Sequence, residues 1–408
     1  MEPSGAGAMR VLQINTVCGT GSTGRIATDI HNFLVNNGHE SYIAYGRGYP
    51  RKCNNAIKIG SQWDVYSHVA LTRLLDKHGL GSAKATKSLI HHIDSLNPDI
   101  IHLHNIHGYY INYEILFEYL KERNRPVVWT LHDCWAFTGH CAHFDFIGCE
   151  KWKVQCNICP QTYRYPKSLL RDNSGDNYLR KRRSFTGVNE LVLISPSKWL
   201  ARLVTESFLG EYHIEVIHNG IDVTCFKPIE SHFRVKRNLN NKFIILGVAN
   251  RWEDRKGLRY FVELCEQLEE DEVIVLVGLD KKQLKNLPKK IIGMTRTDSL
   301  EELVGIYSAA DVFVNPTLED NFPTTNLEAL ACGTPVITFD TGGSSESIGQ
   351  NCGYVVSKGD LEGLVTAIRR VKRHEKLYYR DSCVNHVREN FNKEQIFKKY
   401  LKIYENVL

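Results

Sequence analysis

Two acidic residues eight positions apart, Asp320 and Glu328, lie on either side of a predicted helix start. Pro323 suits that start, because proline has a helical φ and the first turn needs no N–H donor from it. The unpaired N–H groups and the dipole of a helix start attract phosphate, and a nearby acid can bind ribose hydroxyls. The stretch 315–335 therefore predicts a site for a phosphate and sugar hydroxyls. The alternative is that Glu319, Asp320 and Glu328 are ordinary acids of a first helical turn.

Two cations, Arg251 and Lys256, border a turn that precedes another predicted helix, which begins at about residue 258. Such a pair suits a diphosphate, because arginine offers a planar fork of donors and lysine a compact charge. Alone, the pair is better explained as surface charge. Because the acids at 319–328 lie in the same α/β half of the chain, we expect the cations and the acids to serve one binding site.

A glycine-rich turn, Gly19-x-Gly21-x-x-Gly24, follows a predicted strand at 10–14 and opens a helix. Its spacing matches the dinucleotide fingerprint, which also needs an acid at the end of the second strand. That strand ends here in Tyr45-Gly-Arg-Gly, so we do not expect an NAD site. The loop still suits close approach of the backbone to an anion at a helix start, and a simple tight turn is the alternative.

His132 comes directly after a buried strand, 126–131, and α/β proteins bind ligands at the carboxyl ends of parallel strands. We therefore expect His132 to face a ligand; the alternative is a capped structural histidine. His102 and His104 alternate with apolar residues on another predicted strand, so they share one face. Such a pair is more often a core or edge feature than a metal site.

Four of the twelve cysteines are clustered, at Cys141, Cys149, Cys156 and Cys159. A Cys-x2-Cys pair with two further cysteines suits a structural, tetrahedral Zn²⁺. The spacing of the first two is wider than in zinc fingers, and two alternatives stay open: free thiols that pack a small lobe, or disulfides in an exported chain. Because we find no secretory signal, we expect a reducing compartment.

Composition excludes several classes of protein. Hydrophobic residues make up 42% and charged residues 24% of the 408, as in ordinary globular proteins. No apolar run approaches the roughly 18 residues of a membrane span, and no basic-aromatic pattern suggests nucleic acid. The net charge of +5 lies in the half before residue 220. This surplus is either a solvated surface or a means of attracting anionic lipid or a phosphorylated acceptor.

The sequence from Asp320 to Glu328, followed by Ala-Leu-Ala-Cys-Gly-Thr-Pro, resembles the acid-x7-Glu signature of family 4 of the retaining glycosyltransferases. Arg251-x4-Lys256-Gly is similar to the cation element of that family. Residues 130–140 resemble a branch of it that acts in bacterial surface-polysaccharide biosynthesis. Asp320 stands where the family usually has glutamate, so the resemblance leaves open whether Glu319 or Asp320 meets the donor sugar.

The resemblance implies an α/β protein of the GT-B fold, with two doubly wound Rossmann-like domains facing a central cleft. We expect a disordered leader or tag remnant at 1–8. An acceptor-side domain then covers 9–225, with a cysteine-rich insertion at 140–160. A domain for the nucleotide-sugar donor covers 226–390, and a C-terminal helix at 391–408 crosses back to the first domain.

The resemblance also implies roles for individual residues. The residues assigned to catalysis are His132, Glu319, Asp320, Arg251 and Lys256. The donor side adds Gly21, Asn321, Phe322, Pro323, Thr324, Thr325 and Glu328. The acceptor side comprises Gly19, Ser22, Thr23, His104 and Thr138.

The implied reaction moves a hexose from a nucleotide-diphosphate sugar to a hydroxyl of a lipid-linked glycan, with retention of configuration. No Asp-x-Asp occurs, which fits chemistry that needs no metal cofactor; a structural Zn²⁺ at the cysteines is a separate matter. We expect a cytoplasmic enzyme, peripheral on the inner face of the cell membrane. The alternatives are a GT-B epimerase or hydrolase that acts on the donor alone, or a degenerate subunit that only binds a glycan or nucleotide sugar.

Overall fold

The chain forms two compact units in the computed structural model, which describes residues 7–408. Most of the leader expected at 1–8 therefore lies outside the described residues. Unit 1 runs to Ile217 and includes Phe397–Leu408, and unit 2 is His218–Ile396. The expected boundary near residue 225 falls inside unit 2. Its first segment is held there because the N–H of Ile221 donates to the Phe391 carbonyl, and Lys393 pairs with Asp222 at 2.6 Å.

Unit 1 is built on a seven-stranded parallel sheet with the order β3-β2-β1-β4-β5-β6-β7. The strands are β1 (Arg10–Val17), β2 (Glu40–Arg47), β3 (Ala56–Lys58), β4 (Ile100–Leu103), β5 (Val127–Thr130), β6 (Leu191–Ser195) and β7 (His213–Val216). Every residue of β4 and β5 is buried, as expected for parallel strands that are covered on both faces.

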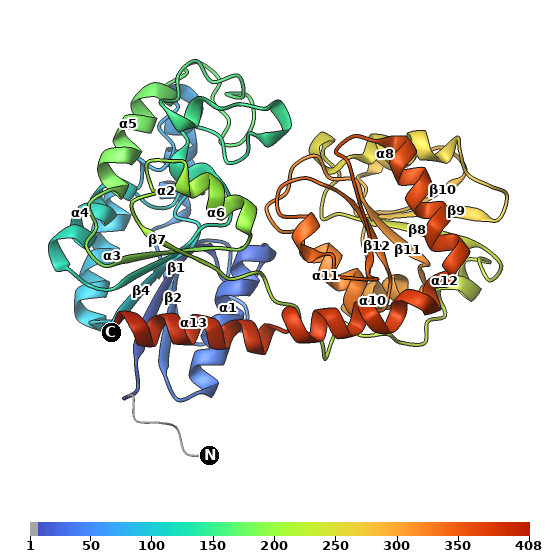
Figure 1. The fold of residues 1–408 in the computed structure, drawn as a ribbon. Helices are drawn as coiled ribbons and strands as arrows, with labels where there is room; N and C mark the ends of the chain where they lie inside the picture. Colours follow the sequence, from blue (N-terminus) through green and yellow to red (C-terminus); the bar gives the residue numbers. More distant parts are fainter. Residues whose placement is uncertain (1–6) are drawn as a thin grey trace. The chain divides into compact units, whose positions relative to one another are not determined.

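The helices of unit 1 surround this sheet (Figure 1). They are α1 (Gly21–Asn36), α2 (Gln62–Leu75), α3 (Ala83–Leu96), α4 (Tyr113–Arg123), α5 (Ser174–Phe185) and α6 (Lys198–Thr205). The cysteine-rich segment between β5 and α5 holds only three short 3-10 turns, at Trp135–Phe137, Asp145–Ile147 and Lys151–Lys153. Side-chain packing, more than regular backbone pairing, therefore holds this segment together.

Unit 2 repeats the plan with a six-stranded parallel sheet, ordered β10-β9-β8-β11-β12-β13. Its strands are β8 (Phe243–Val248), β9 (Glu272–Val277), β10 (Ile291–Met294), β11 (Val312–Asn315), β12 (Val336–Phe339) and β13 (Gly353–Val356). Its helices are α7 (Phe233–Lys236), α8 (Leu258–Cys265), α9 (Lys281–Lys285), α10 (Leu300–Ala309), α11 (Thr324–Ala331) and α12 (Leu361–Asn390). The expected pair of doubly wound α/β units is confirmed.

Each sheet reverses its strand order at one place. The reversal lies between β1 and β4 in unit 1 and between β8 and β11 in unit 2. Open α/β sheets bind ligands beside the carboxyl ends of the strands at such a reversal. In unit 2 the loops that leave these ends are 249–257 and 316–323, which carry the cations and acids singled out by the sequence.

The last helix, α13 (Lys393–Val407), begins in unit 2, and its residues from Phe397 onward belong to unit 1. The Phe397 ring lies 5.9 Å from that of Phe33, and the Tyr404 hydroxyl lies 2.7 Å from Nδ1 of His102. None of the helices in residues 7–408 combines the length and the apolar composition that crossing a bilayer requires.

Candidate active site

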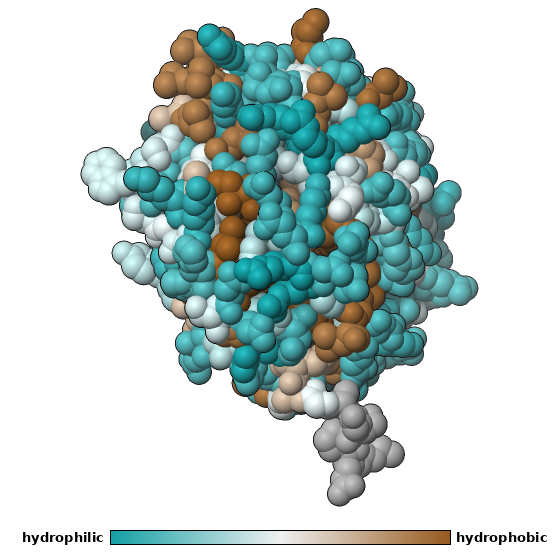
Figure 2. All heavy atoms as spheres, turned by 90° about the vertical axis from the view of Figure 1, so that its left-hand side faces the viewer, coloured by the Kyte–Doolittle hydropathy of each residue, from teal (hydrophilic) through white to brown (hydrophobic). Residues whose placement is uncertain are grey.

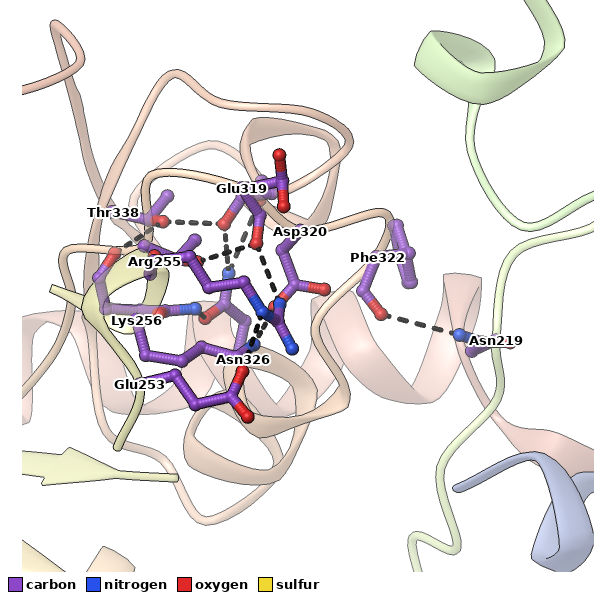
Figure 3. A network of polar contacts seen from close by, with 12 residues as sticks. Asn219, Glu253, Arg255, Lys256, Glu319, Asp320, Phe322, Asn326 and Thr338 are labelled. Atoms are coloured by element: carbon purple, nitrogen blue, oxygen red, sulfur yellow. Dashed lines mark hydrogen bonds and ion pairs between the residues drawn. The ribbon is translucent and has the colours of Figure 1, made fainter. Parts of the chain in front are cut away.

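Lys256 and Asp320 form an ion pair at the strand reversal of unit 2. Lys256 ends a short 3-10 turn after β8, and Asp320 lies in the loop after β11, so the pair joins two loops that are far apart in sequence. Figure 3 shows the lysine side chain extended toward the aspartate carboxylate. The side chains of Lys256 and Asp320 are 24% and 16% exposed, so both charged groups are accessible to a ligand.

Arg255 ties the same two loops together through the backbone. Its Nη1 donates to the Glu319 carbonyl at 3.2 Å, and its Nε pairs with Glu253 at 3.1 Å. Its own carbonyl accepts from the N–H of Leu318 at 2.7 Å. Arg251, which the sequence favoured as the arginine of the site, is exposed, and no ion pair to it is recorded in the described part of the chain.

Glu328 lies in α11 and is held by a hydrogen bond from outside that helix. The Tyr307 hydroxyl donates to its Oε2 at 2.9 Å. Burial raises the pKa of Tyr307 well above its usual value, and the Glu328 charge raises it further, so the hydroxyl stays a donor. Glu328 itself is 8% exposed, so its carboxylate is oriented before any ligand arrives.

A buried amide network fixes the start of α11 beneath these groups. The Asn326 Oδ1 accepts from Asn315 at 2.8 Å, and its Nδ2 donates to the hydroxyl of Ser347 at 2.9 Å. The glycine loop after β12 lies next to this network, and its Gly342 is in the left-handed region at φ +58°. A Cβ at Gly342 would overlap the Asp320 carbonyl, so only glycine allows the two loops to meet.

The first turn of α11 has no side-chain cap. Pro323 stands at the N-cap position, just before the helix rather than in its first turn, and makes no capping hydrogen bond. Thr324 and Thr325 are half-buried at the start of the helix, whereas Asn321 and Phe322 are buried. Uncapped N–H groups at a helix start suit an anionic ligand.

A series of side-chain hydrogen bonds connects His132 with the buried Gln13 of unit 1. Nε2 of His132 lies 3.1 Å from Nδ1 of His104, whose Nε2 lies 3.0 Å from Oε1 of Gln13. The Gln13 amide donates to the Ala27 carbonyl at 3.0 Å, so its oxygen faces His104 and requires a proton on that Nε2. His104 then accepts from His132, which fixes His132 as the Nε2–H tautomer.

The imidazoles of His132 and His104 are both uncharged at pH 7. Burial lowers the pKa of His132 to about 4, although the Asp133 carboxylate opposes the shift. Burial also lowers the pKa of His104 well below its usual value. His132 therefore acts near pH 7 as a neutral hydrogen-bonding group and not as a cation.

The glycine loop of unit 1 opens α1 with an uncapped turn. Thr20, the N-cap residue, makes no side-chain capping bond, and Gly21 and Ser22 are exposed. Thr23 is half-buried. Gly19 has φ +70°, and a Cβ there would overlap the carbonyl of Arg51, so this glycine is required by a close backbone approach. Gly19 is therefore required by the packing of the loop, whereas the space around Gly21 at the start of α1 is open.

Thr138, expected on the acceptor side, is buried beside the cysteine cluster. Its hydroxyl donates to the Cys141 carbonyl at 2.5 Å, and its own carbonyl accepts from Lys181 at 3.0 Å. Lys181 lies in the basic run 180–183, and such a run is most often a solvated helix face. It is instead fully buried, with Nζ 3.5 Å from the centre of the Trp135 ring. Burial lowers its pKa to about 7.

All four clustered cysteines line one small cavity. A hydrogen bond with Cys141 lowers the pKa of Cys159 to about 7, against the effect of burial. Burial raises the pKa of Cys156 to about 11. The expected proximity of the four residues is therefore present, and whether they hold a metal stays a prediction.

Sequence reasoning missed three residues of the unit 2 site. Arg255 is adjacent to Lys256, but the Arg-x4-Lys spacing directed attention to Arg251. Tyr307 lies 21 residues from Glu328 and reaches it only because α10 and α11 pack together. Asn326 sits inside the acid-x7-Glu stretch, where an uncharged amide gave no indication that it is the centre of a network.

Comparisons with known proteins agree with this geometry. A family model described as "Glycosyltransferase Family 4" matches residues 23–224, and one described as "Glycosyl transferases group 1" matches residues 242–374. The colanic acid biosynthesis protein WcaC of Escherichia coli K12 is 27% identical over 88% of this chain and 89% of its own.

Two further proteins extend the comparison. An Escherichia coli galactosyltransferase, named for UDP-Gal and α-D-GlcNAc-diphosphoundecaprenol, is 26% identical over 46% of this chain and 53% of its own. The crystal structure of Anabaena HepE in complex with UDP superposes with a TM-score of 0.69 at 14% identity. That match covers 98% of this chain and 100% of HepE. The expected GT-B architecture is thereby confirmed.

Proposed function

Because the chain belongs to family 4 of the glycosyltransferases, we propose that it transfers a hexose from a UDP-sugar to a hydroxyl of a lipid-linked glycan. The product would be a precursor of a surface polysaccharide. The proposal is based on three contacts at one strand reversal. Arg255 and the Lys256–Asp320 pair join the two loops there, and Tyr307 holds Glu328 in the helix that follows. These groups supply cations for a diphosphate and carboxylates for sugar hydroxyls.

The choice of donor and acceptor rests on relatives. HepE was crystallised with UDP, and the galactosyltransferase is named for UDP-Gal and a diphosphoundecaprenol-linked sugar. WcaC is named for colanic acid, a polysaccharide. These names support a UDP-sugar as the first donor to test and a diphosphate-linked lipid as the first acceptor class.

The Lys256–Asp320 pair explains how the donor site is prepared. Without a donor, Asp320 holds the ammonium in place and offsets its charge. A donor pyrophosphate offers the ammonium a second, doubly charged partner, and Asp320 then becomes available to the sugar hydroxyls. In the transition state Lys256, with Arg255, would carry the charge that develops on the leaving diphosphate. We propose that these side chains replace a catalytic metal ion.

Retention of configuration is the stereochemical part of the proposal. Family 4 enzymes are retaining, and the acids of this site sit in the positions of that family's acid-x7-Glu signature. The leaving diphosphate would take the acceptor proton on the same face of the sugar, so no separate base is needed. Proton NMR of the newly formed linkage gives the anomeric configuration directly, and inversion would refute this part.

Contact with a membrane surface is supported by the cysteine-rich segment. It exposes Val154 and Ile158, at 82% and 81%, next to the exposed Lys151 and Lys153. On the face that Figure 2 draws, apolar side chains, in brown, lie in several separate small groups with hydrophilic ones between them. Apolar tips flanked by cations suit the headgroup layer of an anionic bilayer. Flotation with vesicles of anionic or zwitterionic lipid tests this, and equal binding to both would contradict it.

The experiment that tests the donor site is thermal stabilisation by UDP-, GDP-, TDP- and ADP-sugars. A ligand that binds the folded state raises its melting temperature. We expect a shift with UDP-sugars that is lost in Lys256→Ala and Glu328→Ala. No shift with any donor, in folded protein, would refute the proposed donor site.

The transfer reaction is tested with the donor that binds and a panel of diphospho-lipid-linked sugars. We expect a labelled lipid product that forms without added Mg²⁺ or Mn²⁺. Consumption of the donor without any acceptor would instead show a hydrolase or an epimerase.

A further inference from the structure

A small cavity in unit 1 brings together side chains that bind metals. It is lined by His140 and by Cys141, Cys149, Cys156 and Cys159, and its volume is about 10 Å³. That volume is close to the space of a single water molecule, so the cavity suits one ion and no organic ligand. All the residues that line it lie between Thr138 and Ser174 and belong to unit 1.

His140 is oriented toward this cavity by a carboxylate. Its Nδ1 lies 2.6 Å from Oδ1 of Asp76, and both side chains are fully buried. Its other ring nitrogen, Nε2, is also buried and has no hydrogen-bond partner in the structure. A buried nitrogen without a partner is costly unless a ligand satisfies it. An imidazole that donates to a carboxylate through one nitrogen is the usual arrangement of a metal-bound histidine.

Asp76 is itself held in place, so the orientation of His140 does not depend on one contact. Its Oδ2 accepts from the N–H of Asn173 at 2.8 Å, and its main-chain carbonyl accepts from Asn177 at 2.5 Å. The residue occupies the left-handed region at φ +52°. The end of α2 is thereby fixed to the start of α5 at the edge of the cavity.

The four thiols differ in burial and in their contacts. Cys141 shares a hydrogen bond with Cys159, and Cys156 interacts with both. The Cys159 thiol also interacts with His140. Cys149 is only half-buried and interacts with Cys156. Cys141 and Cys156 are buried and Cys159 interacts with His140, so these three thiols are the candidates to join the histidine as ligands.

We propose that this cavity binds one Zn²⁺-type ion, with Nε2 of His140 and the thiolates of Cys141, Cys156 and Cys159 as its four ligands. Three sulphurs and one imidazole form a closed tetrahedral set, which is typical of a structural zinc site and leaves no position for a substrate. The four donors come from three places in one irregular segment: 140–141, 156 and 159.

The charge of such a site is balanced by a group already present. One Zn²⁺ with three thiolates carries a net charge of −1, and the buried Lys181 interacts with Cys156 and Cys141. Its Nζ is fixed by the carbonyls of Trp135 and Thr138, at 2.6 Å and 3.0 Å. A fully buried ammonium next to a cluster of thiols is explained if those thiols are ionised.

The ligand atoms have to draw together when the ion binds. Within residues 7–408, Glu269, Asp271 and Glu272 are the group of three possible metal ligands whose ligand atoms all lie within 4.8 Å of one another. No three of the cavity residues have their ligand atoms this close together. The acidic set is already neutralised by Lys372 and Arg369. In the cavity, a change of χ1 rotamer is the smallest movement that closes a thiol onto the ion, with release of its proton.

The first test uses the unaltered full-length chain and no activity assay. The reduced protein is stripped of metal, titrated with Zn²⁺ by calorimetry, and analysed for bound metal by mass spectrometry. We expect one ion per chain and a higher melting temperature on binding. With Co²⁺ we expect the strong d–d bands of a tetrahedral site and thiolate charge-transfer absorption. Folded, reduced protein that takes up no metal, or a stable Cys141–Cys159 disulfide, would overturn the proposal.

Variants then identify the ligands. We expect His140→Ala and Cys159→Ser to lose the tetrahedral Co²⁺ spectrum, whereas Cys149→Ser keeps it. Cys134→Ala is the matched control, because this buried thiol neighbours Cys141 but does not line the cavity. Near-ultraviolet circular dichroism checks that each variant is folded. Full metal affinity in His140→Ala, combined with loss in Cys149→Ser, would overturn the ligand set.

Asp76→Asn tests the positioning role of the carboxylate. The variant keeps the size of the side chain and removes the charge that orients His140. We expect roughly 10- to 100-fold weaker Zn²⁺ binding with an unchanged thiolate-to-Co²⁺ absorption, because the ligands themselves are still present. Unaltered affinity would show that Asp76 has no part in binding the ion.

Discussion

The Tyr307 hydroxyl donates a 2.9 Å hydrogen bond to the Glu328 carboxylate, and it is the contact that prepares Glu328 for a ligand. Both residues are buried, and they come from neighbouring helices, α10 and α11. If Glu328 binds the donor as proposed, the strength of donor binding depends on Tyr307, a residue outside the loops that carry the cations and acids.

We expect Tyr307→Phe to weaken donor binding about 5- to 10-fold, the equivalent of roughly 1 kcal/mol for one hydrogen bond to a charged group. The ring and its packing stay, so the chain should still fold. Calorimetry with the nucleotide measures the effect. Tyr354→Phe is the matched control, because it loses a hydrogen bond to Tyr379 within the same unit but away from the site. Equal binding by both variants would contradict the role assigned to Tyr307.

Lys256→Ala should lower kcat by roughly 10²- to 10³-fold, the usual effect of removing one group that stabilises transition-state charge. The melting temperature should change little, because both partners of the Lys256–Asp320 pair are partly exposed and such pairs add little stability. Lys372→Ala removes a lysine with three acidic partners elsewhere in unit 2 and serves as the control. Steady-state kinetics that fall equally in both variants would point to a general effect of lost charge.

Gly342→Ala should destabilise the chain and abolish donor binding. The left-handed φ costs alanine roughly 1 kcal/mol, and the added Cβ would also push the Asp320 loop away. Gly187→Ala separates the two effects, since Gly187 has φ +74° but open space around it. If the two variants melt at the same temperature and bind nucleotide equally, the contact of the two loops is not required.

Stability should fall as the pH is lowered from about 6.5 toward 4. Burial lowers the pKa of His68 to about 4, that of His102 to about 3 and that of His132 to about 4. The unfolded chain binds protons at about pH 6.5, so it binds more than the folded chain within this window. The contribution is therefore fully present above pH 6.5 and is lost below it.

Melting curves between pH 7.5 and 5 measure this loss. His68→Gln should make the pH dependence shallower, because it removes one of the buried imidazoles. His213→Gln, at an exposed position, should leave it unchanged. A melting temperature that does not vary with pH would contradict the neutral state assigned to these histidines.

The alternation of strands and helices was predictable because the apolar strand segments stand out in sequence. The strands expected at 10–14 and 126–131 were found at Arg10–Val17 and Val127–Thr130, and the acid-x7-Glu stretch was correctly placed on a loop and helix. Both features depend on local sequence. The chemistry of Asp320 and Glu328 could be inferred for the same reason, since their spacing relative to Pro323 is local.

Contacts between distant segments were not predictable. The burial of Lys181 depends on α5 packing against Trp135, which no local pattern of a basic run reveals. The contact of Arg255 with the Glu319 carbonyl depends on the direction of one short turn after β8, and the role expected of Arg251 stays a prediction. Asp76 and His140 are 64 positions apart in the sequence, and a single αL residue at the end of a helix gives no indication that they form a pair.

The division of α13 between the two units has a consequence for how the chain is made. Residues up to Ile217 leave the ribosome first, but Tyr404, whose hydroxyl bonds with His102 on a central strand, is synthesised only after all of unit 2. Unit 1 therefore cannot reach its final packing until Phe397–Leu408 has emerged, whereas unit 2 is complete once Ile396 has emerged. Early synthesis and late completion fall on the same half of the molecule, so a chain interrupted before Phe397 has an N-terminal half that is unfinished.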